Sequence, residues 1–175
     1  MPRSRILALC LVLPGLAACQ QGVGPTTPDN RPADPAEQAL AARCAGDPGI
    51  AAQLEAAVNA ARLAEGKTVL DPAPALAQIA QGHACDMAGQ GRVDVEGSNG
   101  SSVVDRARAV GYPVCGVVQL VGRGGSPADA VADWLARDAQ RAELLGQPSR
   151  QIGVGYAAGV GGSAYYSVVL GDDCR

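Results

Sequence analysis

Residues 76–89, LAQIAQGHACDMAG, carry the clearest helical pattern in this chain of 175 residues. Their apolar side chains recur at spacings of three and four, which places them on one face of an α-helix. Asp71 and Pro72 precede the stretch as a helix start signal, and Gly89 follows it as a stop signal. We therefore predict a helix from about residue 71 to 89 whose buried face consists of Leu76, Ile79, Ala80, His83 and Met87.

His83 is the only histidine in the chain, and Cys85 and Asp86 follow it closely. Catalysis by a histidine requires a nucleophile or a metal partner within hydrogen-bond reach. The Cys85 thiol points to a different side of the predicted helix, and we expect it to be oxidised. We therefore predict that His83 is a packing residue and that the chain has no catalytic residue.

Three further helices are predicted from the same spacing rule, each with a cap signal at its start. In the second of them, Arg106 and Arg108 are predicted to face outward. In the third, Trp134 and Ala139 are predicted to lie on the apolar side. The three helices are expected at residues 48–66, 102–110 and 126–139.

The strands are predicted from runs of β-branched residues. One such run, residues 114–121, is bounded by glycines and predicts a buried strand. Residues 151–157 and 164–170 form two more runs on either side of a glycine-rich turn, which predicts a β-hairpin. Tyr165 and Tyr166 are neighbours on its second strand, so we expect one to be buried and the other exposed.

Residues 1–18 have the pattern of a secretory signal peptide, with two arginines, a short apolar run and small residues at the end. The apolar run is too short to span a membrane. Residues 16–19, LAAC, resemble the lipobox of bacterial lipoproteins, whose cysteine is acylated and becomes the new N-terminus. The resemblance implies that Cys19 carries a lipid anchor, with palmitate expected among its acyl groups.

The residues after Cys19 indicate a tether followed by one domain. Residues 19–36 are rich in Pro, Gly and short polar residues and cannot bury enough apolar surface to fold. Residues 37–175 are long enough for a single hydrophobic core. Gln20 stands where the inner-membrane retention signal of lipoproteins would place Asp, which implies the outer membrane of a Gram-negative bacterium. We therefore expect an exported protein that is held to the membrane by Cys19.

Cysteine usage agrees with export. Of six cysteines, one leaves with the signal peptide and one is acylated. No Cys-x-x-Cys pair is present, so neither a zinc site nor a redox motif is predicted. An even number of cysteines in an oxidising compartment predicts two disulfides, with all three pairings open. The four cysteines concerned are Cys44, Cys85, Cys115 and Cys174.

The charge excludes one class of partner. The formal net charge is −3, and removal of the signal peptide with its two arginines makes it more negative. Binding to nucleic acid requires a basic surface. We therefore expect no nucleic-acid partner.

The order of these landmarks resembles the CAP superfamily of cysteine-rich secretory proteins in its bacterial SCP-like form. The resemblance covers about residues 56–171 and implies an α+β fold, an α-β-α sandwich with a central antiparallel sheet. Its carriers are Asn59-Ala60-Ala61-Arg62, Leu76 through His83-Ala84 to Asp86-Met87-Ala88, Gly100-Ser101-Ser102, Asp105-Arg106, Gly111-Tyr112, Trp134, Arg141, Leu144-Leu145, Ile152-Gly153-Val154-Gly155 and Tyr165-Tyr166.

The resemblance also implies a cleft that in many members holds a divalent metal on two histidines and one or two glutamates. In this chain those positions fall at Val95, at about Val118 and at Gln140, none of which keeps the ligand. A metal needs several convergent lone pairs, which valines and a single amide do not supply. We therefore expect no metal at this site and no cofactor.

Two other residues belong at the edge of the cleft in this comparison. His83 aligns with a helix position that the family often fills with histidine and that packs between the helix and the sheet. Arg141 follows the lost histidine, and we expect it to pair with a carboxylate. The polar loop at residues 94–100 could suggest Ca²⁺, but it lacks the further ligands and closing Glu of an EF-hand, so we predict an ordinary turn.

The layout of the sandwich suggests a disulfide pairing. Cys85 near the end of one helix and Cys115 at the start of the first strand are expected to meet, which leaves Cys44 to pair with Cys174.

The functional prediction is a non-catalytic, lipid-anchored domain that binds a small apolar ligand, a wall component or another envelope protein. The sequence does not choose among the three. One alternative is an envelope hydrolase with a site that the family does not use, and another is a purely structural lipoprotein. A binding protein should show a concave pocket, whereas a structural one should show a filled cleft and a larger exposed apolar patch.

Overall fold

The computed structural model describes residues 44–146 and 148–174. The predicted signal peptide at residues 1–18, the predicted lipid anchor at Cys19 and the predicted tether at residues 19–36 lie outside the described residues. No helix within the described residues is long and apolar enough to cross a membrane.

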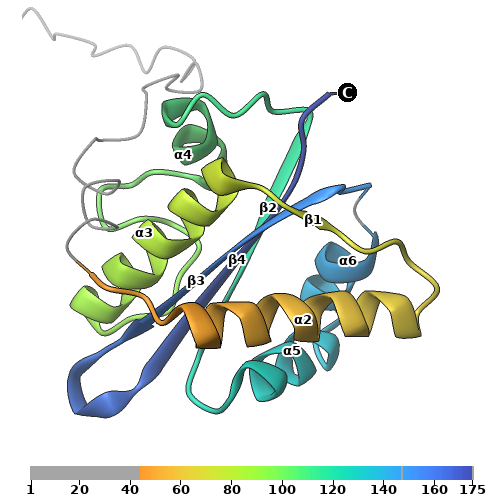
Figure 1. The fold of residues 1–175 in the computed structure, drawn as a ribbon. Helices are drawn as coiled ribbons and strands as arrows, with labels where there is room; N and C mark the ends of the chain where they lie inside the picture. The colour runs from red at the N-terminus through yellow and green to blue at the C-terminus, as the bar shows by residue number, and fades with distance from the viewer. Residues whose placement is uncertain (1–43, 147, 175) are drawn as a thin grey trace, which may run out of the picture.

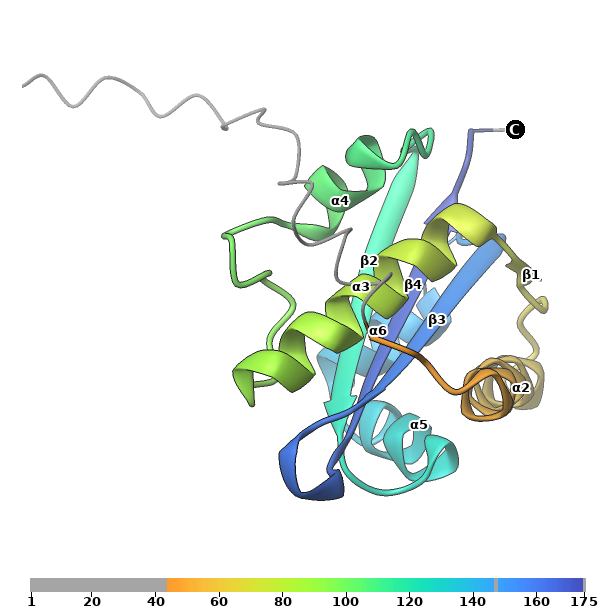
Figure 2. The same ribbon diagram turned by 60° about the vertical axis from the view of Figure 1, so that its left-hand side comes forward.

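A four-stranded sheet in the order β1-β3-β4-β2 forms the middle layer. The two-residue β1 pairs with β3 in parallel, and all other pairs are antiparallel. Helices α3 and α4 cover one face, while α2, α5 and α6 cover the other (Figures 1 and 2). This three-layer arrangement confirms the predicted α+β sandwich. The elements are α2 (Pro48–Ala64), β1 (Asp71–Pro72), α3 (Pro74–Gln90), α4 (Val103–Ala109), β2 (Gly116–Arg123), α5 (Pro127–Leu135), α6 (Asp138–Gly146), β3 (Gln151–Ala158), the 3₁₀ turn η1 (Val160–Gly162) and β4 (Ala164–Asp172).

The helix α3 lies directly on β3 because two glycines of the strand leave room for it. A Cβ atom on Gly153 would overlap the backbone of Leu76, and one on Gly155 would overlap the backbone of Ala80. Both glycines follow the alternation of β3, so they face the same side of the sheet. The sequence Ile-Gly-Val-Gly therefore sets how closely the central helix approaches the sheet.

The boundaries of α3 differ from the prediction. Asp71 and Pro72 do not begin the helix but form β1, because the N–H groups of Asp71 and Ala73 donate to the carbonyls of Arg150 and Ile152 on the neighbouring chain segment. The helix begins at Pro74, and its predicted stop at Gly89 is also wrong. It ends at Gln90, where Gly91 takes the left-handed conformation with φ 68°.

The single helix predicted for residues 126–139 is two helices in the structure. The break between α5 and α6 allows Trp134 and Leu144, one from each helix, to reach the same apolar cluster. Trp134 is fully buried and donates its indole N–H to the carbonyl of Val121 at 2.9 Å. Ala139, predicted on the apolar side of one long helix, is exposed on α6.

Two side chains of α2 tie this helix to the rest of the fold. Asn59 bonds both the N–H and the carbonyl of Leu70, at 2.9 Å and 3.3 Å. The buried Arg62 donates to the carbonyls of Thr68 at 3.0 Å and Leu144 at 2.7 Å. These bonds fix α2 to the segment that enters β1 and to α6.

The prediction that only one of the two tyrosines is buried is wrong. Tyr165 and Tyr166 point to opposite faces of β4, and both are 2% exposed. Tyr165 packs in the cluster beneath α3, and Tyr166 packs in the cluster beneath α2 and α5. Both are buried because helices cover both faces of the sheet.

All four cysteines form disulfides, but the predicted pairing is wrong. The bridges are Cys44–Cys85 and Cys115–Cys174, with Cα–Cα distances of 5.8 Å and 5.2 Å. Cys115 and Cys174 meet because β2 and β4 are antiparallel neighbours whose register begins with Gly116 opposite Asp172. The strand pairing thus brings the last cysteine to the third rather than to the first.

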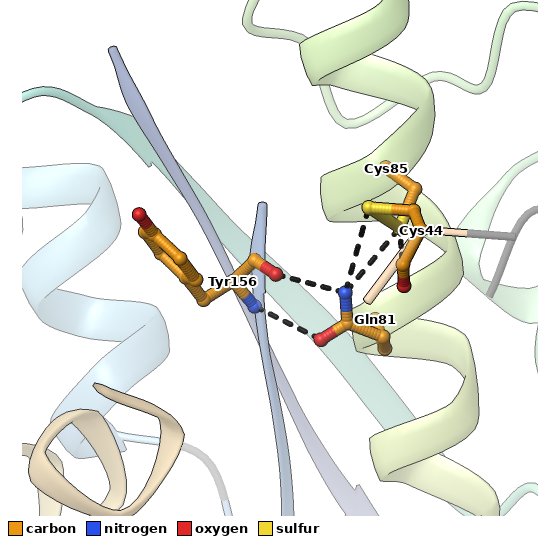
Figure 3. The surroundings of a disulfide bond; sticks show 4 residues. All are labelled: Cys44, Gln81, Cys85 and Tyr156. Atoms are coloured by element: carbon orange, nitrogen blue, oxygen red, sulfur yellow. Dashed lines mark hydrogen bonds between the residues drawn. A yellow bond between two sulfur atoms is a disulfide. The ribbon is translucent and has the colours of Figure 1, made fainter. Parts of the chain in front are cut away.

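The Cys44–Cys85 bridge is held by a glutamine on α3 (Figure 3). Gln81 donates its amide to the sulfur of Cys85 at 3.3 Å and to the carbonyl of Tyr156 at 2.8 Å. Its amide oxygen accepts from the N–H of Tyr156 at 3.2 Å. Gln81 therefore joins the bridge, α3 and β3 at one point.

Candidate ligand-binding pocket

A pocket of about 460 Å³ lies at the β2 edge of the sheet, between α4 with its preceding loop and α6. It reaches around the edge strand, because Val117 belongs to the cluster on the α3 and α4 side and Val118 to the cluster on the α2, α5 and α6 side. The lining is mainly apolar. The residues that line it are Val95, Glu96, Gly100, Ser102, Val103, Val117, Val118, Gln119 and Glu143.

The structure brings together two of the three positions that the CAP resemblance predicts to have lost a metal ligand. Val95 and Val118 both line the pocket. Gln140 does not, and its amide oxygen instead accepts from Arg137 at 3.1 Å on the same helix. The site that would hold a metal is therefore an apolar wall in this chain.

Two lining residues of the pocket, Val95 and Gln119, are hydrogen-bonded by a buried arginine that the sequence predicts to face outward. Arg106 is 1% exposed, because α4 turns this side of the helix toward β2. Its guanidinium donates to the carbonyl of Val95 at 2.8 Å, to the carbonyl and hydroxyl of Ser101 at 2.7 Å and 3.0 Å, and to the side-chain oxygen of Gln119. Gln119 in turn donates to the hydroxyl of Ser167 at 2.8 Å. Arg108, also predicted outward, is exposed.

Glu143 is a charged lining residue that was not predicted from the sequence. It lies on α6, three residues after Gln140 and hence on a neighbouring part of the same helix face, which is the signal that could have found it. Its side chain is half-buried, and burial raises the pKa of its carboxyl. Among the described residues it has no hydrogen-bond or ion-pair partner.

The loop before α4 is held by its own polar side chains. Asp94 accepts the N–H of Glu96 at 3.0 Å and pairs with Arg92 at 2.8 Å. The backbone hydrogen bond from Glu96, together with the charge of Arg92, lowers the pKa of the Asp94 carboxyl. Asp86, 3% exposed on α3, accepts the N–H of Ser98 at 2.8 Å. The turn is therefore held by one carboxylate of the loop and one of α3.

His83 lies beneath this loop rather than in the pocket. It is fully buried, and its Nε2 lies 2.7 Å from the carbonyl oxygen of Asp94. Arg141 pairs with a carboxylate, as expected, but that carboxylate is Glu65 at the end of α2, at 2.7 Å. Neither His83 nor Arg141 lines the pocket.

Comparison with known proteins establishes the family. The sequence profile of the cysteine-rich secretory protein family, CAP, matches residues 55–170. This chain belongs to the CAP family. No curated protein matches the sequence.

Solved structures of other bacterial proteins show the same fold. An outer surface protein from Borrelia burgdorferi is 14% identical, with a TM-score of 0.66, over 71% of this chain and 93% of its own. An extracellular protein with an SCP domain from Bacillus anthracis is 19% identical, with a TM-score of 0.62, over 71% of this chain and 41% of its own. A cysteine-rich secretory protein from Staphylococcus aureus is 18% identical, with a TM-score of 0.54, over 71% of this chain and 38% of its own. The match therefore spans less than half of the Bacillus and Staphylococcus proteins.

The residues of this CAP domain do not fit the metal that the family implies. Val95 and Val118, which the resemblance predicts at ligand positions, line the pocket and have no lone pairs to donate. Within residues 44–146 and 148–174, no group of three His, Cys, Asp or Glu side chains is placed to hold a metal ion. No step of the function is assigned to a metal here.

Proposed function

We propose that this CAP domain is a binding module whose pocket at the β2 edge takes a small ligand with an apolar body. The observation that carries the proposal is an open pocket with a mainly apolar lining, whose wall includes Val95 and Val118. The CAP resemblance places both valines at positions where many members have polar metal ligands, which supports the proposal. A volume of about 460 Å³ is within the usual range for pockets that bind small molecules. Burial of an apolar ligand against these valines would provide the main favourable free energy.

Catalysis is disfavoured by the composition of the pocket. Within the described residues, its lining contains no histidine, cysteine or lysine. Ser102 is a lining residue, but its hydroxyl is the N-cap of α4 and donates to Asp105 at 2.6 Å. Asp105 is itself engaged in the capping box, and a hydroxyl without a histidine or lysine beside it as general base is a weak nucleophile. These features support a binding role over the hydrolase alternative.

We further propose that the protein is exported and held to the outer membrane through a lipid on Cys19. The signal and lipobox pattern of residues 1–19 supports this location, as do the two disulfides. Proteins of the same fold are an outer surface protein in Borrelia burgdorferi and an extracellular protein in Bacillus anthracis. The pocket would then be presented to molecules of the envelope.

Native mass spectrometry tests the binding function. The protein would be purified from an oxidising periplasm without added ligand. A binding module is expected to retain a small molecule, seen as a stable extra mass above the oxidised chain. Val95→Asp should abolish that mass by charging the pocket wall, whereas the control Val69→Asp, at a valine of similar exposure outside the pocket, should retain it.

Two results would contradict the proposal. An extra mass that survives in the Val95→Asp variant would place the ligand elsewhere. A bare mass, together with no binding of added apolar compounds, would favour a purely structural domain. A cell-wall fragment or an envelope protein as the bound species would be distinguished by its mass.

A further inference from the structure

We propose that the pocket selects ligands that carry a protonated amine next to their apolar body, and that the Glu143 carboxylate is the partner of that amine. The inference rests on the proposed binding function and names its ligand class. Four valines provide the apolar wall, and two carboxylates provide the only charged side chains among the described lining residues. The valines are Val95, Val103, Val117 and Val118, and the carboxylates are Glu96 and Glu143.

The two carboxylates differ in how strongly they would attract a cation. Glu96 is exposed on the loop, so water and salt screen its charge. Glu143 is half-buried against the apolar wall, where an ion pair with a ligand is screened less. An ammonium group there would form a charge-assisted hydrogen bond with the carboxylate. Glu143 is therefore the selective group, and Glu96 adds negative potential at the same pocket.

The position of Glu143 is unfavourable for the free protein. Burial raises the pKa of its carboxyl, and no described residue supplies a positive charge or a hydrogen bond to it. It also lies within the last turn of α6, at the end where the helix dipole is negative. Because no described residue compensates this charge, a cationic ligand would gain from binding there.

The nearby positive charges do not change this conclusion. The guanidinium of Arg106 is buried and donates to Val95 and Ser101 of the loop and to Gln119 of β2. Arg141 on α6 is paired with Glu65, and Arg137 donates to Gln140. None of these three arginines lines the pocket. Arg92, which donates to the carbonyl of Glu96, is paired with Asp94 and does not line the pocket either. A ligand with a carboxylate would therefore meet two negative groups and no cation among the described lining residues.

The test compares three probes of equal chain length that differ only in their polar group: n-octylamine, 1-octanol and octanoate. Binding to the purified protein at pH 7 would be measured by calorimetry, with the valine methyl groups followed by NMR to locate the site. We expect octylamine to bind roughly tenfold more tightly than octanol, as is typical of a hydrogen bond to a charged group. Octanoate should bind most weakly, and the methyl shifts should fall on the pocket valines.

The variant Glu143→Gln removes the charge and keeps the shape of the side chain. It should lower the affinity for octylamine to that for octanol, so that the preference for the amine disappears. The matched control is Glu55→Gln, at a half-buried glutamate on α2 outside the pocket, which should keep the full preference. Proton NMR spectra of both variants would confirm that they fold.

The outcomes separate this inference from the function on which it rests. Equal binding of octylamine and octanol at the pocket valines would overturn the amine selectivity and leave the apolar binding function standing. Preference for octanoate would also overturn it, and would show that the charge of Arg106 dominates the pocket. No binding of any probe would contradict both proposals.

Discussion

Two buried side chains hold consecutive carbonyl groups of the loop that forms one wall of the pocket. His83 on α3 lies 2.7 Å from the carbonyl oxygen of Asp94, and Arg106 on α4 donates to that of Val95 at 2.8 Å. Because side chains from two different helices bind two successive peptide groups, the loop is restricted at this point. At the residue scale, the loop wall of the pocket therefore depends on two buried side chains that do not themselves line the pocket.

The variant Arg106→Met tests that support. Methionine retains most of the apolar stem but leaves the acceptors of Val95, Ser101 and Gln119 without their donor. We expect the free energy of unfolding to fall by about 3 kcal/mol, because several buried acceptors lose their partner. Urea unfolding measures the change. The exposed Arg108→Met on the same helix is the control and should change it by less than about 0.5 kcal/mol. Equal effects of the two substitutions would contradict the proposed role of Arg106.

At the scale of elements, the contact of α3 with β3 is a backbone-to-backbone approach that only glycine permits. A Cβ at Gly153 or Gly155 would overlap the helix backbone, which cannot move away as a flexible side chain could. The close packing of α3 on β3 is thus possible because the strand lacks a Cβ atom at these two positions.

Alanine substitutions at glycines of α3 and β3 are expected to act in opposite directions. Gly153→Ala should lower the free energy of unfolding by at least about 2 kcal/mol, because α3 must shift outward. Gly89→Ala lies at an exposed position of α3 with no atom within 4 Å of the added carbon, and should raise it by about 0.5–1 kcal/mol. Thermal or urea unfolding checks both. A neutral Gly153→Ala would show that the contact is looser than described.

The capping box of α5 predicts a pH dependence. The hydrogen bonds from the backbone N–H and the hydroxyl of Ser126 lower the pKa of the Asp129 carboxyl. A depressed folded-state pKa contributes stability that is present above the ordinary Asp pKa of about 3.9 and is lost as the pH falls through the folded value. We expect wild type to exceed Asp129→Asn in stability by the largest margin above about pH 5, with the margin shrinking below about pH 4.

Unfolding of wild type and variant from pH 6 to pH 2.5 would measure this margin. Asp133→Asn serves as the control. Asp133 is exposed on the same helix, and its side chain makes no hydrogen bond with the described residues. Its margin should stay small across the range. A margin for Asp129→Asn that does not change with pH would rule out ionisation of this carboxyl as the source of the capping stability.

At the scale of the whole molecule, one disulfide ties the start of the described chain to a helix, and the other closes the end of the β2–β4 strand pair. Cys44 joins the start of the described chain to α3, and Cys174 joins the last strand to β2. The sequence separations of 41 and 59 residues correspond, in the chain-entropy account, to about 4 kcal/mol for each bridge. The bridges therefore account for a substantial part of the stability expected of a domain of this size.

Peptide mapping without reduction is expected to recover Cys44 linked to Cys85 and Cys115 linked to Cys174. The double variant Cys115→Ser with Cys174→Ser should lose roughly 4 kcal/mol of unfolding free energy while retaining the first bridge. A peptide that links Cys85 to Cys115 would contradict the strand register as well as the pairing.

Two kinds of feature could be predicted from the sequence. The first depends on residues that are close neighbours in the chain, and the second depends on the order of motifs along it. The helix pattern of residues 76–89, the cap at Asp47 and the glycine-rich hairpin depend on neighbours within a few positions, and each is found in the structure. The order of the motifs led to the CAP resemblance, which the family profile confirms. The resemblance also led to Val95 and Val118, although the pocket that they share could not be predicted.

By itself, the sequence thus determined the fold class and most of the helices and strands, but not the break between α5 and α6 or the short strand β1. Only the tertiary structure decided that Arg106 is buried, that both tyrosines are buried and that Glu143 lines the pocket. It also decided the cysteine pairing. The physical reason is that each of these properties depends on which faces of distant segments come together. Periodicity shows that a face exists, but the register of β2 on β4 and the packing of helices on both sides of the sheet decide what that face meets.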